Sequence, residues 1–465
     1  MFFRGLKFGF QSEAQSGSHS VAKSKALDMT SGNIARLIVQ FAFPLLLGNL
    51  FQQLYNTVDS VILGNYVGKE ALAAVGASNH FVRTLVGFFM GFSTGGSIVI
   101  SQFFGARNPD GVKKTVHTIL LSTVFLGVVF TFVGMAGNFW LLKLNGTPAD
   151  IIDDAHIYLG IQFEGVAFLM LYNAGAGILR AVGDSKRPVY FLVASSLLNV
   201  VLDFAFVVFF GWGIAGASYA TIISQAISAF LTLFALFRSK EIYRLEFRSL
   251  CIDFPILWKV VRLGVPGGIQ QSITSFSNIF VQGYVNRFGS DCVAGWTCFN
   301  KIDQFCLLPV KSLQLSSTTF TGQNYGAGKF ARARKGAFVT LSIALGIAVF
   351  SLVFSQIFAA GLVSVFNREE GVLYYGRYFL RVCSVFYIAR VFSPVLAGSL
   401  RGFGNATMPM LILLFSHVAF RQIYLFVVTH LTSAFFPVAL ASPVGWLASS
   451  ILMTSYYLFY TRKMK

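Results

Sequence analysis

Long apolar stretches separated by short polar segments make up most of the chain from Ile34 onward. A helix needs about 20 residues to cross the ~30 Å hydrocarbon core of a bilayer, and the stretches reach that length. The pattern therefore predicts membrane-spanning helices. We expect twelve spans, over residues 34–64, 72–104, 117–140, 155–179, 189–210, 214–236, 256–284, 293–322, 337–366, 375–399, 409–429 and 432–460.

The composition narrows the class of protein. Of the 465 residues, 55% are hydrophobic and 12% are charged, about half of the ~25% charged share of soluble proteins. This excludes a soluble globular protein, a disordered chain and a disulfide-stapled secreted domain. The five Cys form no Cys-x-x-Cys pair, so we interpret them as packing residues. An all-α integral membrane protein remains.

The net charge of +18 comes from basic residues that lie mostly between the apolar stretches. We interpret the excess as cytoplasmic loops at an anionic membrane face rather than as a nucleic-acid surface. With the N-terminus inside, inner segments hold 24 Lys and Arg, and outer loops hold four. We therefore predict a multi-pass protein of the plasma (inner) membrane with both termini cytoplasmic. Residues 1–33 lack the features of a signal peptide and are expected to form a cytoplasmic tail.

Two segments recur 221 positions apart. The sequence LRAVGDSKRP at 179–188 returns as LRGFGNATMP at 400–409, and QFFGA at 102–106 returns as QNYGA at 323–327. We predict two six-helix halves, 34–236 and 256–465, joined by a cytoplasmic linker, 237–255. Six spans give both halves the same orientation, so a pseudo-two-fold axis near the membrane normal should relate them. We interpret the repeated Arg-x-x-Gly as a tight inner loop, with Gly making the turn and Arg180 and Arg401 at the membrane interface.

Several motifs carry a resemblance to a known family. They are Pro44, NTVD at 56–59, Gly64, ALAAVG at 71–76, SQFFGA at 101–106, LRAVGD at 179–184 with Pro188, LGVP at 263–266, KID at 301–303, GQNYGA at 322–327 and RGFG at 401–404. Together they resemble the multidrug and toxic compound extrusion (MATE) family, in its bacterial type with an Asn/Asp pair in the fifth helix. The resemblance implies an efflux antiporter that exports amphipathic, often cationic compounds in exchange for H⁺ or Na⁺ by alternating access between two halves.

Asp59 is one of only four acids inside the predicted spans, together with Glu164, Asp203 and Asp303. Ionisable groups in a bilayer are functional suspects because they are costly to bury. Gln52, Tyr55 and Asp59 are spaced i, i+3 and i+7 on one helix face, and Asn56 adds to the polar stripe. We expect this stripe to face the protein interior and to line a substrate cavity. A helix–helix hydrogen bond is the alternative role.

Asn199 and Asp203 lie one turn apart on the fifth span. Their oxygens suit a small cation, or an acid whose neutral form is hydrogen-bonded, and Thr221 of the sixth span could add a hydroxyl. Asp59, Asn199, Asp203 and Thr221 resemble the polar cluster that family members with this pair use for cation or proton coupling. These four are the candidate Na⁺ ligands if Na⁺ is the coupling ion, and the sequence does not choose between Na⁺ and H⁺.

Three other charged residues have less defined roles. Asp303 either contacts substrate or acts locally, and Glu164 is expected to pair with an Arg. We interpret Arg421 as the only clear basic residue in mid-span, which requires a partner or a wet cavity.

No Walker loop, nucleophile–base arrangement or metal-ligand spacing is present, so we expect no enzyme and no cofactor beyond the coupling ion. The expected partners are small amphipathic molecules and membrane lipid, with no nucleic acid, and the chain is expected to be a monomer. A lipid-linked precursor flippase of the same superfamily is one alternative, although flippases usually have a strongly cationic cavity. A channel is another, although an acid in one half alone favours a transporter.

Overall fold

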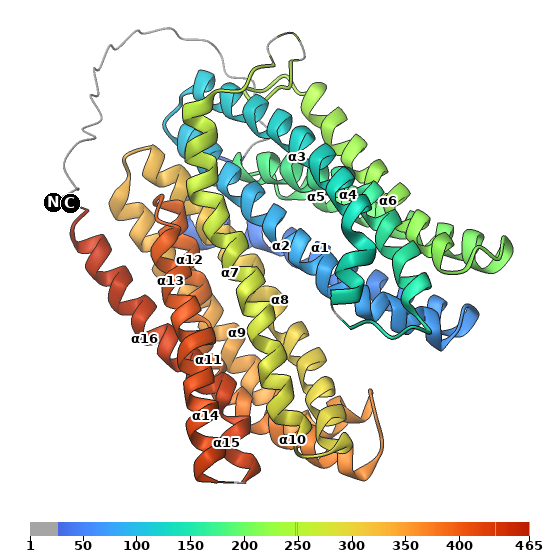
Figure 1. The fold of residues 1–465 in the computed structure, drawn as a ribbon. Helices are drawn as coiled ribbons and strands as arrows, with labels where there is room; N and C mark the ends of the chain where they lie inside the picture. Colours follow the sequence, from blue (N-terminus) through green and yellow to red (C-terminus); the bar gives the residue numbers. More distant parts are fainter. Residues whose placement is uncertain (1–26, 145, 247, 249, 433, 465) are drawn as a thin grey trace, which may run out of the picture.

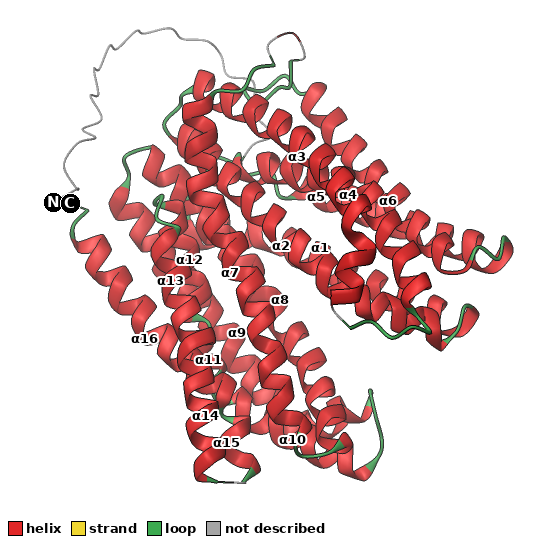
Figure 2. Cartoon of the chain, in the orientation of Figure 1, coloured by secondary structure: helices red, strands yellow, loops and turns green. Residues whose placement is uncertain are grey.

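Helices occupy all twelve predicted ranges in the computed structural model, which describes residues 27–464 except 145, 247, 249 and 433 (Figures 1 and 2). Nearly all of the described residues are helical, and none of them forms a strand. The first six ranges contain α1 (Ile34–Tyr66), α2 (Lys69–Gly105), α3 (Pro109–Leu144), α4 (Ile152–Ala181), α5 (Lys186–Asp203) continued by the π-helix η1 (Phe204–Phe209), and α6 (Gly213–Phe237).

The second six ranges contain more helix breaks than the first. They hold α7 (Phe254–Asn286), α8 (Ser290–Gly326), α9 (Phe330–Ser364), α10 (Glu370–Ser384), α11 (Tyr387–Arg390), α12 (Phe392–Gly402), α13 (Thr407–Leu414), the π-helix η3 (Phe415–Phe420), α14 (Arg421–Leu431), α15 (Phe435–Ala439) and α16 (Ala441–Arg462). Figure 1 shows the first group, in blue to green, diverging from the second, in yellow to red, toward the bottom and right of the view.

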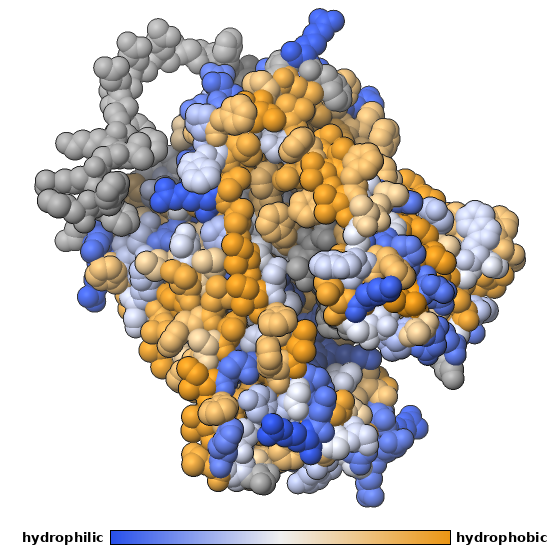
Figure 3. Space-filling view, in the orientation of Figure 1, coloured by the Kyte–Doolittle hydropathy of each residue, from blue (hydrophilic) through white to orange (hydrophobic). Residues whose placement is uncertain are grey.

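The outer surface fits a bilayer. Eight described helices are long and apolar enough to cross a membrane, and a ninth span results if the bent pair Glu370–Ser384 and Tyr387–Gly402 counts as one. Large apolar side chains such as Phe132 and Phe209 are exposed, and Figure 3 shows broad apolar areas between hydrophilic ends. The remaining predicted spans, 256–284, 293–322 and 432–460, are helical but carry polar residues toward a cavity described below.

Two predicted spans are not continuous. The span 432–460 contains α15 and α16, with Leu440 between them. We expected a single helix over 375–399, but α10 and the segment α11–α12 meet at an angle of 56°. The bend falls at Val385 and Phe386, between the two helices. Pro394 lies in the first turn of α12, where its missing N–H and its ring account for the separate break between α11 and α12. By contrast, Pro44, Pro266 and Pro309 lie inside α1, α7 and α8.

The repeated Arg-x-x-Gly segments form matching turns, as predicted. Gly183 and Gly404 follow α4 and α12 with φ of +91° and +88°, values that favour glycine because a Cβ atom would be strained there. The next residue caps the following helix in each half. The Asp184 carboxylate accepts from the backbone N–H of Arg187 (3.2 Å), and the Asn405 amide oxygen accepts from that of Met408 (3.3 Å).

The two groups of helices contact each other reciprocally where α2 and α8 end. The Gln102 side chain of α2 donates to the carbonyl of Gly402 (2.9 Å), and the Gln323 side chain of α8 donates to that of Ala181 (3.0 Å). Donors and acceptors are each 221 positions apart, so the second bond repeats the first with the two halves exchanged. Such a pair of contacts is expected of a two-fold relation.

A second contact between the halves joins α2 to α7 through paired Gly-x-x-x-Gly motifs that we did not predict. A Cβ atom on Gly91 would lie 2.6 Å from the backbone nitrogen of Gly268, and one on Gly95 would lie 2.7 Å from that of Gly264. The two backbones therefore touch directly. Small residues at this spacing allow such close crossing of membrane helices.

The last residues of the predicted N-terminal tail, 27–33, are bound to the helices of the second half. Met29 is buried; its N–H donates to the Gln323 side chain (3.0 Å), and its carbonyl accepts from the Asn324 amide (3.1 Å). Residues 27–33 thus do not form a free tail, because backbone groups of this segment find hydrogen-bond partners in the second half. The rest of the predicted tail, residues 1–26, lies outside the described residues.

Candidate substrate and cation sites

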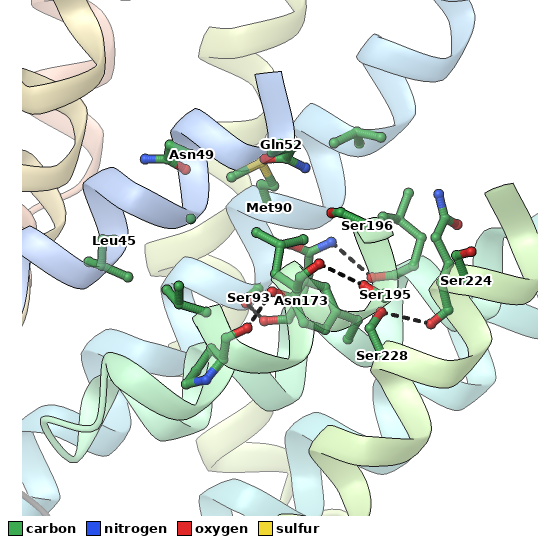
Figure 4. Close-up of a pocket in the computed structure, with 18 of the residues that line it drawn as sticks. Leu45, Asn49, Gln52, Met90, Ser93, Asn173, Ser195, Ser196, Ser224 and Ser228 are labelled. Carbon is green, nitrogen blue, oxygen red and sulfur yellow. Dashed lines mark hydrogen bonds between the residues drawn. The ribbon is translucent and has the colours of Figure 1, made fainter. Parts of the chain in front are cut away.

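A cavity of about 160 Å³ lies within the first six helices. Figure 4 shows its wall, with Asn49 and Gln52 from α1, Ser93 from α2, Asn173 from α4, and serines from α5 and α6. Of the predicted residues, Gln52, Tyr55, Asn199 and Thr221 line it. Amides and hydroxyls are the main polar groups, so the cavity can bind a ligand through hydrogen bonds.

The Asn199–Asp203 pair is buried with unsatisfied polar atoms. Both carboxyl oxygens of Asp203 and both polar side-chain atoms of Asn199 lack a hydrogen-bond partner in the described part of the chain, and Asp203 is fully buried. Thr221 donates to the carbonyl of Ala217 (3.0 Å), which leaves its oxygen able to accept or ligate. Buried polar groups without a partner need a proton, a cation or water.

Asp59 of α1 lies close enough to Asp203 for the two carboxyl groups to interact electrostatically. Both carboxyl groups are also close enough to interact electrostatically with the hydroxyl groups of Tyr55 and Tyr158. One Asp59 oxygen is buried without a hydrogen-bond partner within the described residues. Two neighbouring carboxyls in a dry site do not both ionise readily unless a cation lies between them. Tyr158 of α4 was not among the residues predicted for this cluster. Nothing in the sequence pattern around Tyr158 indicated that it would lie near the acids.

The candidate cation ligands are few and mixed in type. The described residues contain no cluster of three or more His, Cys, Asp or Glu side chains. A cation at Asp59 and Asp203 would therefore rely on amide and hydroxyl oxygens for its other ligands. Such hard oxygen donors suit Na⁺ or a proton rather than a transition metal.

Two predictions about polar residues in the first half are wrong. Asn56 is exposed and lines neither cavity described here, whereas its neighbour Gln53 accepts a bond from Gln304 of α8 (3.2 Å). The polar stripe is therefore divided between the cavity, the other half and the exterior. Glu164 is exposed and forms no ion pair within the described residues, because its face of α4 points outward.

A larger cavity of about 600 Å³ lies within the second half. Four basic side chains from four helices line it: Lys311 of α8, Arg390 of α11, Arg401 of α12 and Arg421 of α14. Asp303 is the one acid among its described lining residues. This cavity is therefore cationic.

Asp303 and Arg390 form a short ion pair. Their oxygen and nitrogen are 2.6 Å apart, Asp303 is 8% exposed, and the Arg390 guanidinium lies 4.0 Å from the ring centre of Trp446. Asp303 thus lines a cavity, and its charge is matched by that of Arg390. The stack holds the guanidinium against an aromatic face.

Arg421 and Arg401 have neutral partners. Arg421 donates to Ser277 (3.0 Å) and Asn278 (2.9 Å), and Arg401 donates to Gln270 (2.8 Å). Neither forms an ion pair within the described residues, and the Nε atom of each is buried without a partner. Arg421 therefore has both the partners and the cavity that its mid-span position required.

The interpretation of Arg421 as the only clear mid-span base is wrong. Lys311 and Arg390 lie inside predicted spans, so the rule that singled out the intramembrane acids applied to them as well. The repeated arginines, predicted to lie at the membrane interface, both line cavities. Arg180 lines the cavity of the first half and Arg401 that of the second, because both precede the turn on the last helical turn.

Each half has a buried charged residue beside a π-helical segment. Asp203 immediately precedes η1, and Arg421 immediately follows η3. π-helical turns disturb the regular hydrogen-bond ladder and often mark functional sites.

Comparisons with known proteins agree with this architecture. The MatE family model matches the chain twice, over residues 44–205 and 266–427. "Probable multidrug resistance protein YoeA" of Bacillus subtilis is 30% identical, over 93% of this chain and 95% of its own length. "Probable multidrug resistance protein YpnP" of the same organism is also 30% identical, over 82% and 85%. A solved structure described as the outward-facing conformation of a multidrug resistance MATE family transporter matches with a TM-score of 0.90 and 23% identity, over 95% of this chain and 99% of that one. The chain therefore belongs to the MATE family of multidrug efflux transporters and is a transporter rather than an enzyme.

Proposed function

We propose that this chain is a secondary antiporter that exports amphipathic compounds, cationic drugs among them, in exchange for H⁺ or Na⁺. The observation that carries the proposal is the buried pair Asn199 and Asp203, whose polar atoms have no partner in the described protein and which lies within reach of the Asp59 charge. A proton or cation would satisfy these atoms. The names of the relatives support small-molecule export and do not favour the flippase alternative.

Coupling follows from the charge of the acidic pair. If one carboxyl of the Asp59–Asp203 pair stays protonated, a bound proton or Na⁺ neutralises the other, and the surrounding helices can close around them. When the ion leaves, the carboxylate needs water or a cationic group, so the open form of the cavity is favoured. The ion therefore favours the closed form of the first half, and a substrate that binds the open cavity favours the other form. Because the two ligands stabilise different forms, binding of one promotes release of the other, as exchange requires.

Alternating access would use the two halves as rigid units. The reciprocal bonds of Gln102 and Gln323 hold them together at one end, and a switch in access requires these bonds to break. We propose that this end faces the cytoplasm, with both termini and the linker 237–255, in the plasma membrane. The charge distribution supports this orientation, since the basic residues gather in the segments at this end.

Proteoliposome transport of ethidium tests the coupling. Asp203→Asn removes the titratable group at nearly constant volume, so ethidium transport driven by a pH or Na⁺ gradient should fall at least about tenfold. Glu164→Gln is the matched control, because it removes an exposed carboxyl from the same half. Imposing the two gradients separately identifies the ion.

The outcome that contradicts the proposal is clear. If Asp203→Asn accumulates ethidium against its concentration gradient at the wild-type rate, the pair is structural and coupling lies elsewhere. If wild type transports ethidium under neither gradient, antiport of cationic compounds by this chain is wrong.

A further inference from the structure

We propose that the cavity of the second half binds the anionic group of an amphipathic aromatic substrate, a phosphate or a carboxylate, between Arg401 and Arg421. The proposal deepens the proposed export function by naming a further class of substrate. It rests on the charge of the cavity, the free donors of its arginines and the residues of its wall.

The first observation is the charge that the protein leaves uncompensated. Asp303 neutralises Arg390 at 2.6 Å, but Arg401 and Arg421 have only amide and hydroxyl partners among the described residues. Arg421 is 6% exposed. A buried guanidinium without a counter-charge is costly, and an anion that enters the cavity removes that cost. The protein thus provides a site in which an anion binds more favourably than a neutral group.

The second observation is the direction of the donors that remain. The Nε atoms of Arg401 and Arg421 are both buried and have no partner in the described structure, and both residues line the same cavity. The neighbour of Nε in each guanidinium, Nη2, holds the side chain on α7, through Gln270 for Arg401 and through Ser277 and Asn278 for Arg421. The Nη1 group of each arginine makes no hydrogen bond with the described residues, and it can donate a charge-assisted bond to a carboxylate or phosphate oxygen.

The third observation is the remaining wall of the cavity. Trp296 and Trp446 line it together with polar residues from one face of α7, including Thr274 and Gln282. Aromatic faces suit a planar ring, and amides and hydroxyls suit its polar edge. The volume of about 600 Å³ is in the range of small-molecule sites, ~300–1,000 Å³.

The two halves therefore differ in the charge of the ligand they suit. The cavity of the first half has the unpartnered Asn199 at its wall and acids close by, with Arg180 as the one charged residue among its described lining residues. The cavity of the second half has four basic residues and one acid. One transporter thus offers a cation site and an anion site in separate halves.

Riboflavin and riboflavin 5′-phosphate test the anion site, because the two probes share one ring and differ by a phosphate. Binding to the full-length protein in phosphatidylcholine nanodiscs is measured by quenching of flavin fluorescence. We expect the phosphate form to bind at least about tenfold tighter, as a charge-assisted hydrogen bond in a buried site should. Raising the salt concentration should weaken the phosphate form alone.

Variants locate the site. Arg421→Gln and Arg401→Gln should each lower the affinity for the phosphate form about tenfold and leave riboflavin affinity unchanged, whereas Arg421→Lys should keep part of the preference. Arg377→Gln is the control, because Arg377 is an exposed arginine of α10. The riboflavin affinity of each variant shows that the protein is folded, so a folding defect cannot imitate loss of the anion site.

The source of the anion is set by a second nanodisc. If phosphatidylglycerol in place of phosphatidylcholine weakens binding of the phosphate form alone, a lipid headgroup competes for the site; if not, the site takes a soluble anion. Equal affinity for the two flavins, or an equal loss with Arg377→Gln, overturns the proposal. The ethidium assay is independent of the flavin assay. If the wild-type protein transports no ethidium under either gradient but still binds the phosphate form more tightly than riboflavin, the export function is refuted and the anion site is not.

Discussion

Replacement of Gly95 by Ala tests the direct backbone contact between the halves. The new methyl group would lie 2.7 Å from the backbone nitrogen of Gly264 and 2.8 Å from its Cα atom. Backbone atoms cannot rotate aside as a side chain can. The methyl group therefore fits only if α2 and α7 move apart.

The size of the effect follows from these distances. Ordinary contact requires a separation larger by about 1 Å, and a gap of that size forfeits a quarter to a half of each dispersion contact along the crossing. Overpacking of this kind costs about 1–3 kcal/mol. Gly137 of α3 provides the control, because a Cβ atom there meets nothing within 4 Å. Gly137→Ala should be neutral or stabilise the helix by about 0.5–1 kcal/mol.

Thermal unfolding in detergent, followed by tryptophan fluorescence at one fixed scan rate, measures the difference. For a chain of this length, we expect Gly95→Ala to lower the apparent melting temperature by about 1–5 °C. A fixed scan rate is needed because unfolding of such proteins is often irreversible. Gly137→Ala should melt at or above the wild-type temperature.

A double variant adds a sharper criterion. Gly95→Ala and Gly264→Ala place methyl groups in one contact, so the second should cost less once the first has separated the helices. A Gly95→Ala protein that melts with the wild type would refute the reasoning. Strictly additive losses would show that the two glycines do not share a contact.

Two further predictions concern polar contacts in the membrane. Asp303→Asn leaves Arg390 buried without its counter-charge, so it should destabilise the protein by about 3–5 kcal/mol; adding Arg390→Met should restore part of the loss in thermal unfolding, and no recovery would argue against the pair. Gln102→Ala removes one reciprocal bond, worth about 0.5–1.5 kcal/mol, whereas Gln323→Ala also removes the bond from the Met29 N–H. Each should raise the share of protein open at that end in spin-label distance measurements, with Gln323→Ala having at least the effect of Gln102→Ala, and an effect from one residue alone would contradict the reciprocal contact.

The repeat and the apolar stretches predicted much of the architecture. Lengths of apolar sequence located all twelve helical ranges. The 221-residue offset related Gln102 to Gln323 but did not predict the contacts that they make. The break in the span 375–399 was not predicted, because Val385 and Phe386 at the bend are apolar and continue the hydrophobic pattern of the span. The paired glycines at 91, 95, 264 and 268 are present in the sequence, but their role in packing could not be predicted without knowing that α2 crosses α7.

The candidate sites were predictable in part. Asn199 and Asp203 stand out by spacing alone, and Thr221 lines the cavity that Asn199 also lines. The second cavity was missed because its charges come from four helices far apart in sequence, and no local pattern relates Lys311 to Arg401. Arg401 was also assigned to a loop by its neighbour Gly404, although its place on the final helical turn directs it inward.

The reciprocal bonds of Gln102 and Gln323 give the surface between the halves the symmetry of a homodimer interface. Two copies of the first half would each offer the same glutamine and the same carbonyl at position 181. The single chain thus has the geometry of an ancestral dimer of identical six-helix subunits, joined through residues 237–255. Once the subunits are fused, the sequence of each half can change independently. The first half now has buried acids, whereas the second half has several arginines around its cavity.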